Sequence, residues 1–261
     1  VYWSDRSGAF EAAGVGVADV LEGDGDDPWA PFARIEAALT SGHPNLRYYG
    51  GLRFNPASAT SDAWRPFGAS KFILPRFELL TTGKQSYLAC NVLLGPDSDH
   101  DQVLDEILEA MGRLHFPEDH AFQERHFVRR EGDHPDRPEW RRMVDEALAL
   151  MRAGELEKVV LAREVEFRME QGGSSMAMLD QVLRRGEAVY GFLFQPCDGV
   201  AFMGASPERL YRRRGRYIES EAVAGTRPRG ATPEADAALG LELMASEKDV
   251  REHQFVVDAL H

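Results

Sequence analysis

Residues 188–225 read AVYGFLFQPCDGVAFMGASPERLYRRRGRYIESEAVAG, and this stretch decides the fold class. Short runs of apolar and aromatic residues alternate with glycine and proline turns, which is the pattern of strands joined by hairpins. The sequence predicts a strand over 188–195, a hairpin over 199–206 and a strand pair over 209–223. Because hairpins join antiparallel strands whereas parallel strands need long crossovers, we expect an antiparallel α+β fold.

Basic residues inside this stretch gather in the run RRRGR at 212–216. The run lies between two strand-like segments, so a solvated hairpin turn is favoured over a binding patch. The formal net charge of the 261-residue chain is -13. A nucleic-acid partner is therefore not expected, because neutralising phosphates requires an extended basic field.

Further elements lie on both sides of this stretch. Apolar spacing and end signals predict helices over 26–42, 99–114, 138–153, 176–185 and from 233 onward. Thr232 is a good N-cap for the last of these helices, with Pro233 at its first position. Two strands joined by a TTGKQ turn are predicted over 71–94, where Pro75 indicates an edge or bulged strand, and another strand is predicted over 157–169.

The polar segment 115–140 is rich in histidine and proline and is predicted to be a linker or surface excursion. Its histidines do not share one helical face, so solvated side chains are favoured over a metal cluster; they are His115, His120, His126 and His134. The segment divides the chain into a predicted amino-terminal part, 1–134, and a predicted catalytic part, 135–261.

Composition limits the class of protein. Hydrophobic residues make up 43% of the chain and no long apolar run occurs, which predicts a soluble protein without a membrane span. Cys90 and Cys197 are too few for a disulfide framework, so we expect reduced, buried thiols in a cytoplasmic protein. Because the chain begins at Val1 and ends at His261 within a helical pattern, we expect a stretch of a longer polypeptide.

Two side chains are candidates for acid/base chemistry. Lys158 opens KVVLAREVEF, and Glu208 ends the apolar run in GASPERL. A lysine acts as a base only when burial or a nearby cation keeps it neutral, and the apolar residues that follow Lys158 are consistent with burial. A glutamate in a dry cleft stays protonated and can act as an acid. Taken alone, each residue is more often a solvated surface group.

Two further motifs are candidates for ligand contacts. Ala224, Gly225 and Thr226 lie where a strand turns, and a glycine there lets backbone N–H groups approach an anion. Glu252 belongs to the helical motif SEKDVREH, where an inward-facing carboxylate requires a cation partner. A tight turn and a solvated glutamate are the commoner interpretations of such residues.

In this order and at these separations the four motifs resemble the chorismate-utilising enzymes, which include isochorismate, salicylate, anthranilate and aminodeoxychorismate synthases. The runs YYGGLRF at 48–54 and FILPRFEL at 72–79 resemble the amino-terminal part of isochorismate synthases of menaquinone or siderophore pathways. The resemblance therefore extends through nearly the whole chain.

The resemblance implies a Mg²⁺-dependent conversion of chorismate to isochorismate, in which water adds at C2 as the C4 hydroxyl leaves. It implies that Lys158 activates the water and that Glu208 protonates the departing hydroxyl. It also implies that the turn at Ala224, Gly225 and Thr226 contacts the ring carboxylate of the substrate. Glu252 is implied to bind Mg²⁺. Magnesium bridging that glutamate to the substrate would offset the charge of a dianion. We expect no nucleic-acid or membrane partner, and a monomer is favoured.

Other reactions of the family are distinguished at the same positions. Aminodeoxychorismate synthases have a lysine nucleophile where this chain has Ala224, and anthranilate synthases typically have glutamine in place of Lys158. Water is therefore the favoured nucleophile. Salicylate synthase stays open, because it shares the lysine and the acid and then eliminates pyruvate. An inactive chorismate-binding module also stays open, since the family's carboxyl-terminal residues, which supply further magnesium and pyruvyl contacts, are missing from this sequence.

Overall fold

The computed structural model describes residues 1–41, 43, 45–58, 60–116, 128–170, 172–186 and 188–260. Every strand pairing among these residues is antiparallel, and helices lie between the strands, so the predicted α+β class is confirmed. The chain forms two compact units, Val1–Glu124 with Gly173–Pro207 and Arg125–Gly172 with Glu208–His261. The units interleave along the sequence, and the division at residue 134 stays a prediction.

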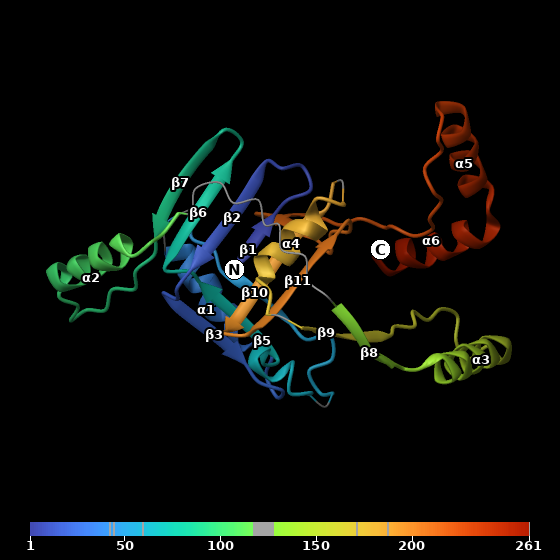
Figure 1. Ribbon diagram of the computed structural model, residues 1–261, viewed down its shortest axis with the longest axis horizontal. Coiled ribbons are helices and arrows are strands. Elements are labelled where there is room, and N and C mark those ends of the chain that lie inside the picture. The colour runs from blue at the N-terminus through green and yellow to red at the C-terminus, as the bar shows by residue number, and fades with distance from the viewer. Residues whose placement is uncertain are drawn as a thin grey trace. The chain divides into compact units, whose positions relative to one another are not determined.

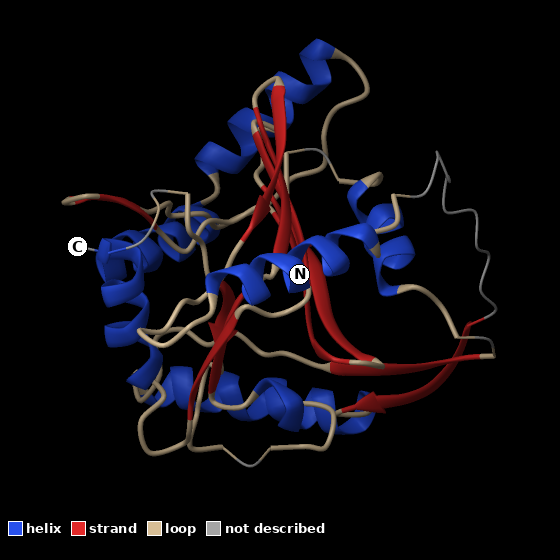
Figure 2. Ribbon diagram, turned by 90° about the vertical axis from the view of Figure 1, so that its left-hand side faces the viewer, coloured by secondary structure: helices blue, strands red, loops and turns tan. Residues whose placement is uncertain are grey.

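The first unit contains a six-stranded sheet (Figures 1 and 2). Its strands, in spatial order, are β11 (Val200–Ser206), β10 (Tyr190–Cys197), β1 (Tyr2–Ser4), β2 (Phe10–Val15), β6 (Phe77–Thr82) and β7 (Gln85–Cys90). The two strands predicted over 188–206 are confirmed as β10 and β11. Their sheet is completed by the amino terminus of the chain, since Trp3 of β1 pairs with Phe192 of β10.

A three-stranded sheet, in the order β3 (Asp19–Gly23), β5 (Ser70–Leu74) and β4 (Tyr49–Leu52), belongs to the same unit. β5 is its central strand, so the predicted edge or bulged strand at Pro75 is wrong. Pro75 instead follows β5 and precedes β6, which belongs to the other sheet. Its carbonyl accepts a hydrogen bond from Asn91 Nδ2 at 2.9 Å, and its missing N–H removes no hydrogen bond from either sheet.

The first unit contains three α-helices and a 3₁₀ helix among its described residues, and two of the α-helices begin at a capping side chain. The helices are α1 (Ala30–Ser41), α2 (His100–Gly112), α4 (Ser175–Leu183) and the 3₁₀ helix η1 (Arg65–Phe67). Asp99 caps α2 by accepting a hydrogen bond from the Asp101 N–H at 3.0 Å, and Ser174 caps α4. α4 lies against β10 and β11, where Ala177 and Leu179 are buried (Figure 1).

Among the described residues the buried apolar side chains all belong to the first unit; they are Ala12, Leu21, Ala69, Ile73, Leu74, Phe77, Leu80, Ala177, Leu179 and Leu193. Burial of this kind stabilises a fold by roughly 25 cal/mol for each Å² of apolar surface. Among the described residues of the second unit no apolar side chain is buried to this extent. The second unit is therefore held mainly by partial burial, caps and ion pairs.

Among its described residues the second unit has two strand pairs and three helices. The pairs are β8 (Val128–His134) with β9 (Glu164–Met169) and β12 (Arg212–Arg214) with β13 (Tyr217–Glu219), and the helices are α3 (Arg137–Ala153), α5 (Pro233–Ala245) and α6 (Glu247–Leu260). β12 and β13 confirm the predicted strand pair, and the basic run forms β12 and the turn that follows it, where Gly215 has φ 59°. Thr232 caps α5 as predicted, accepting from the Ala235 N–H.

Several predicted features differ from the structure. The strand predicted over 157–169 begins at Glu164, because residues 157–163 have no ladder partner among the described residues. The helix predicted from 233 onward is two helices, because Ser246 takes an extended conformation and its Oγ accepts from the Asp249 N–H. Cys90 and Cys197 are exposed, so the buried-thiol prediction is wrong; both lie at strand ends.

Two of the histidines considered as metal ligands, His120 and His126, lie outside the described residues. Among the described residues, no group of three or more histidine, cysteine, aspartate or glutamate side chains is placed to hold a metal ion. No helix in the described ranges is long and apolar enough to cross a bilayer.

A buried polar pair links the two sheets of the first unit. Tyr49 of β4 donates a hydrogen bond to the carboxylate of Glu78 on β6, and only 1% of Glu78 is exposed. Burial raises the pKa of the Glu78 carboxyl above its ordinary value of 4.5, although the Tyr49 hydrogen bond and Arg47 oppose the shift. The folded chain therefore holds a proton at Glu78 at pH values where the unfolded chain has lost it.

We predict that Glu78→Gln reduces the loss of stability at rising pH. Because the folded pKa is raised, the carboxyl contributes fully to stability below 4.5, and the contribution is lost as pH rises through the folded pKa. Urea unfolding from about pH 4.5 to about pH 8 should show the variant gaining stability relative to the parent protein. Glu36→Gln, on the exposed face of α1, is the matched control. Parallel curves for Glu78→Gln and the parent would contradict the assignment.

Candidate functional site

The predicted site residues all lie in the second unit; they are Lys158, Glu208, Ala224, Gly225, Thr226 and Glu252. They come from three places in its sequence: the irregular segment after α3, the residues around β12 and β13, and α6. The sequence motifs were separated by up to about a hundred residues, and the fold gathers them into one compact unit.

A cavity of about 780 Å³ within this unit brings Lys158 and Glu252 together. Its walls come from α3, from residues 157–161 and from α6, and its lining residues are Trp140, Met151, Glu157, Lys158, Val159, Val160, Leu161, Glu247, Lys248, Arg251, Glu252 and Phe255. The volume is within the range of about 300–1,000 Å³ that small-molecule sites occupy. Two of the predicted site residues therefore line one cavity.

α6 contributes one continuous face to this wall. Its lining residues lie at positions 247, 248, 251, 252 and 255, the spacing that places side chains on one side of a helix. Glu252 is half-buried on this face, and Phe255 adds an apolar surface one turn further along. The helix therefore presents charged groups of both signs to the cavity.

Lys158 is half-buried, and its neighbours only partly enclose it. The segment 157–163 forms no strand, and 81% of Val160 is exposed. The enclosure that keeps a lysine neutral is thus incomplete within the described residues.

Glu208 is exposed just beyond the end of β11 and does not line the cavity. The preceding carbonyl, of Pro207, accepts a hydrogen bond from Arg6 Nη1 at 2.9 Å. The structure therefore does not bring Glu208 and Lys158 into one cavity. Their pairing as acid and base stays a prediction.

The turn at Ala224, Gly225 and Thr226 is fastened to α5 and α6. Gly225 has φ 82°, a conformation that favours glycine. After the turn, Arg227 donates to Asp249 Oδ2 at 2.8 Å and to Glu242 Oε1 at 2.9 Å. His253, beside Glu252, lies 3.2 Å from the Ala222 carbonyl through its Nε2 atom. The turn and the helix that carries Glu252 are thereby held together.

Asp249 is the central acceptor of this arrangement. Hydrogen bonding by Ser246 and then by Arg227 lowers its pKa, and Lys248 adds a smaller effect of the same sign. Its carboxylate is only 12% exposed and stays charged at neutral pH, so its ion pair with Arg227 persists there. Asp249 is thereby engaged in holding the turn, which leaves Glu247 and Glu252 as the carboxylates of α6 that line the cavity.

These carboxylates fit part of a magnesium site. Mg²⁺ binds through one or two protein carboxylates and completes its six ligands with water and substrate oxygens. Glu252 can supply one such carboxylate, and Glu247 lies on the same wall of the cavity. The donor set is therefore compatible with Mg²⁺ held jointly by protein and substrate.

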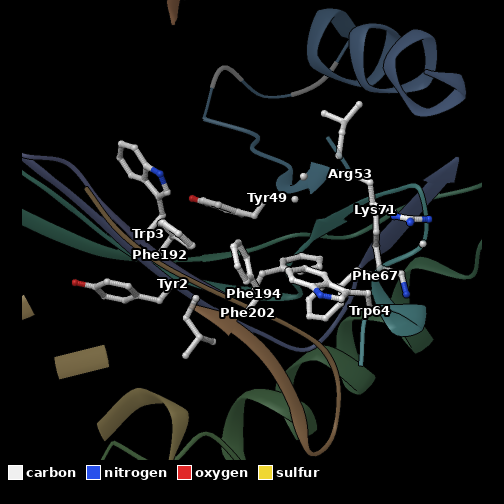
Figure 3. Close-up of a pocket in the computed structure, with 15 residues that line it drawn as sticks. Tyr2, Trp3, Tyr49, Arg53, Trp64, Phe67, Lys71, Phe192, Phe194 and Phe202 are labelled. Atoms are coloured by element: carbon white, nitrogen blue, oxygen red, sulfur yellow. The ribbon is translucent and has the colours of Figure 1, made fainter. Parts of the chain in front are cut away.

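A second cavity, of about 280 Å³, lies in the first unit and was not predicted from the sequence (Figure 3). Aromatic rings dominate its lining, with Trp64 and Phe192 each 5.3 Å from Phe202 between ring centroids. The alternating aromatic residues of 190–194 were the available signal, but such residues usually form a core.

The cations of this second cavity are already engaged. Lys71 contacts Glu22 at 2.7 Å and donates to the Pro66 carbonyl, and Arg53 donates to Thr60 Oγ1 at 2.6 Å. None of the predicted site residues lines it. Among the described lining residues, aromatic rings therefore dominate the cavity and both cations are engaged by other residues.

Comparison with known proteins relates the whole chain to one family. Residues 1–261 match the family described as "Chorismate binding enzyme". The chain is 31% identical over 279 residues to the salicylate biosynthesis isochorismate synthase of Pseudomonas aeruginosa, covering 100% of this chain and 55% of the relative. It is 29% identical over 260 residues to the isochorismate synthase MenF of Escherichia coli, covering 98% and 55%.

The fold is also similar to a solved structure. The structure of MenF, the menaquinone-specific isochorismate synthase from Escherichia coli, superimposes with a TM-score of 0.78 and 28% identity. The match covers 98% of this chain and 55% of that chain. The chain spans about half the length of the curated relatives it matches.

We predict that Gly225→Ala loosens the turn from α6. An added Cβ would lie 3.2 Å from Asp249 Cβ and 3.2 Å from Leu243 Cδ1, in a conformation that already disfavours a side chain. The free energy of unfolding should fall by about 1–3 kcal/mol, and hydrogen exchange at 222–227 should accelerate. Gly215→Ala is the control, because it shares the positive φ but has no neighbour within 4 Å. Equal losses in both variants would show that packing against α6 is unimportant.

Proposed function

The chain belongs to the chorismate-binding enzyme family, and from this premise we propose that the full-length protein is an isochorismate synthase. It would convert chorismate to isochorismate with Mg²⁺ as cofactor. Two relatives that match nearly the whole chain bear the name isochorismate synthase, which supports this choice within the family. The observation that carries the proposal is the cavity that Lys158 and Glu252 line together.

The proposed reaction exchanges one hydroxyl group for another. Lys158 Nζ accepts a proton from a water molecule whose oxygen forms a bond to C2 of the ring. As the double bonds shift, the C4–O bond breaks, and Glu208 donates a proton to the leaving oxygen, which departs as water. One proton is taken up and one is released, so atoms and charge balance, and solvent exchange restores both side chains.

Glu252 would hold Mg²⁺ with help from water and a substrate carboxylate. When bound, the ion supplies positive charge that offsets the dianion in an acidic protein. The turn at Gly225 and Thr226 would contact the ring carboxylate, and its attachment through Arg227 and Asp249 keeps it beside α6. These residues bind and orient the substrate, while Lys158 and Glu208 move the protons.

We expect the full-length protein to be active and the 261-residue chain alone to be inactive. Glu208 lies outside the cavity, and Lys158 is incompletely enclosed. Because relatives have about twice the length, the remaining polypeptide would have to enclose Lys158 and bring the acid to the substrate. A salicylate synthase and an inactive binding module are the alternatives.

Chromatography of products is the direct test of the proposal. Full-length protein with chorismate and Mg²⁺ should yield isochorismate, and removal of Mg²⁺ with a chelator should abolish the product. Salicylate with pyruvate would identify the first alternative. Unchanged chorismate would favour the binding module and overturn the proposal.

The proposed acid and base predict large effects of two substitutions. Lys158→Ala and Glu208→Gln should each lower kcat by about 10²- to 10⁴-fold, as expected for single proton-transfer groups, without changing the circular dichroism spectrum. Lys84→Ala, in the exposed turn between β6 and β7, should leave kcat unchanged and serves as the control. Near-normal turnover of Lys158→Ala would remove the base assignment.

Glu252→Gln should raise the Mg²⁺ concentration required for half-maximal activity by about 10-fold or more, because an amide is a weaker ligand than a carboxylate. Activity titrated with Mg²⁺ at fixed chorismate measures the effect. Glu247→Gln removes the same charge from the same wall and separates ligation from general electrostatics. If both variants shifted the requirement equally, Glu252 would have no specific role in the metal site.

A further inference from the structure

Six charged side chains line the cavity of the second unit: Glu157, Lys158, Glu247, Lys248, Arg251 and Glu252. In the described part of the chain none of these side chains makes a hydrogen bond or an ion pair to another residue. Elsewhere in the same unit Arg209, Arg227 and Arg229 each pair with a carboxylate. The cavity is therefore lined by charged side chains that form no ion pairs among the described residues of the fold.

Lys248 and Arg251 are the two cations of this set that the proposed reaction leaves unassigned. They lie three residues apart on α6, so both side chains project from the face that lines the cavity. Lys248 is the second residue of the helix, where the helix dipole favours an anion and disfavours a cation. The helix dipole thus gives no reason for a lysine at this position, and the attraction of Lys248 to Asp249 is weaker than that of Arg227. A negatively charged ligand in the cavity would give a reason for the lysine.

We propose that Lys248 and Arg251 together bind one carboxylate of a dicarboxylate substrate, an inference that rests on the proposed function. A guanidinium group can bind both carboxylate oxygens, and an ammonium group adds a point charge beside it. Glu252 lies on the same helical face, so α6 would present a cation-binding group and an anion-binding group to one ligand. This pair also offsets two of the three carboxylates of the cavity, which would otherwise repel a dianion from a chain of net charge -13.

The test uses the full-length protein and chorismate at saturating Mg²⁺. Lys248→Gln and Arg251→Gln should each raise KM by about 10-fold or more and leave kcat within about 2-fold, because the contact is equal in ground and transition states. Lys248→Arg and Arg251→Lys should restore most of the affinity. Lys84→Gln removes an exposed lysine far along the chain from the cavity residues and should change neither constant.

If Lys248 and Arg251 had only a structural role, the glutamine variants would have a lower kcat, a lower stability or both. The charge-conserving variants Lys248→Arg and Arg251→Lys would then not restore the parent values. If a glutamine variant fails to fold, Lys248→Met or Arg251→Met, which keep the apolar stem, replaces it. The double variant carries Lys248→Gln and Arg251→Gln together. If its KM equals that of the parent protein, and the parent turns over chorismate normally, this inference is overturned and the proposed function is left intact.

A binding measurement distinguishes failure of the proposed reaction from failure of the proposed anion site. If the parent protein makes no isochorismate, calorimetry with chorismate and Mg²⁺ still tests whether Lys248 and Arg251 bind the substrate. A Kd at least about 10-fold weaker in the double variant would support the anion site while the proposed reaction fails. Equal Kd values, or no binding by the parent protein, would overturn the anion site as well.

Discussion

The antiparallel pairing of β1 with β10 is the contact on which the rest of the fold depends. It joins Trp3 to Phe192, so the chain between them must close a very long loop before the six-stranded sheet is continuous. Once β10 and β11 take their places in that sheet, residues 125–172 are excluded from the first unit and combine with the chain after Pro207. One strand pairing thereby divides a single polypeptide into two interleaved units.

The two units differ in what holds them. The first has the buried apolar core and an internal aromatic cavity. The second has the charged cavity, and its best-defined contacts are polar, as where Arg227 joins the Gly225 turn to α5 and α6. Apolar packing is strong but without charge selectivity, whereas polar contacts position groups at defined distances. The buried apolar core and the predicted site residues thus lie in different units.

The cavity of the second unit differs in charge from the chain as a whole. The chain is acidic, and yet its cavity is lined by equal numbers of acidic and basic side chains. The proposed substrate, with two carboxylates, would require such local balance, because a uniformly acidic wall would repel it. α6 carries side chains of both signs on the face that lines the cavity, Glu247 and Glu252 beside Lys248 and Arg251, so the proposed metal ion and anion could both be held by one helix.

Features that depend on neighbouring residues were determined by the sequence itself. The hairpins of 188–223 and the capped start at Thr232 follow from local periodicity, turn residues and caps, and the family was recognised from four short motifs that resemble it. Tertiary structure alone decided that Pro75 passes between two sheets, that residues 157–163 leave the strand, and that Lys158 shares a cavity with Glu252 but not with Glu208. Each of these outcomes requires a partner far away in the sequence, and no local pattern specifies which distant strand or helix that partner will be.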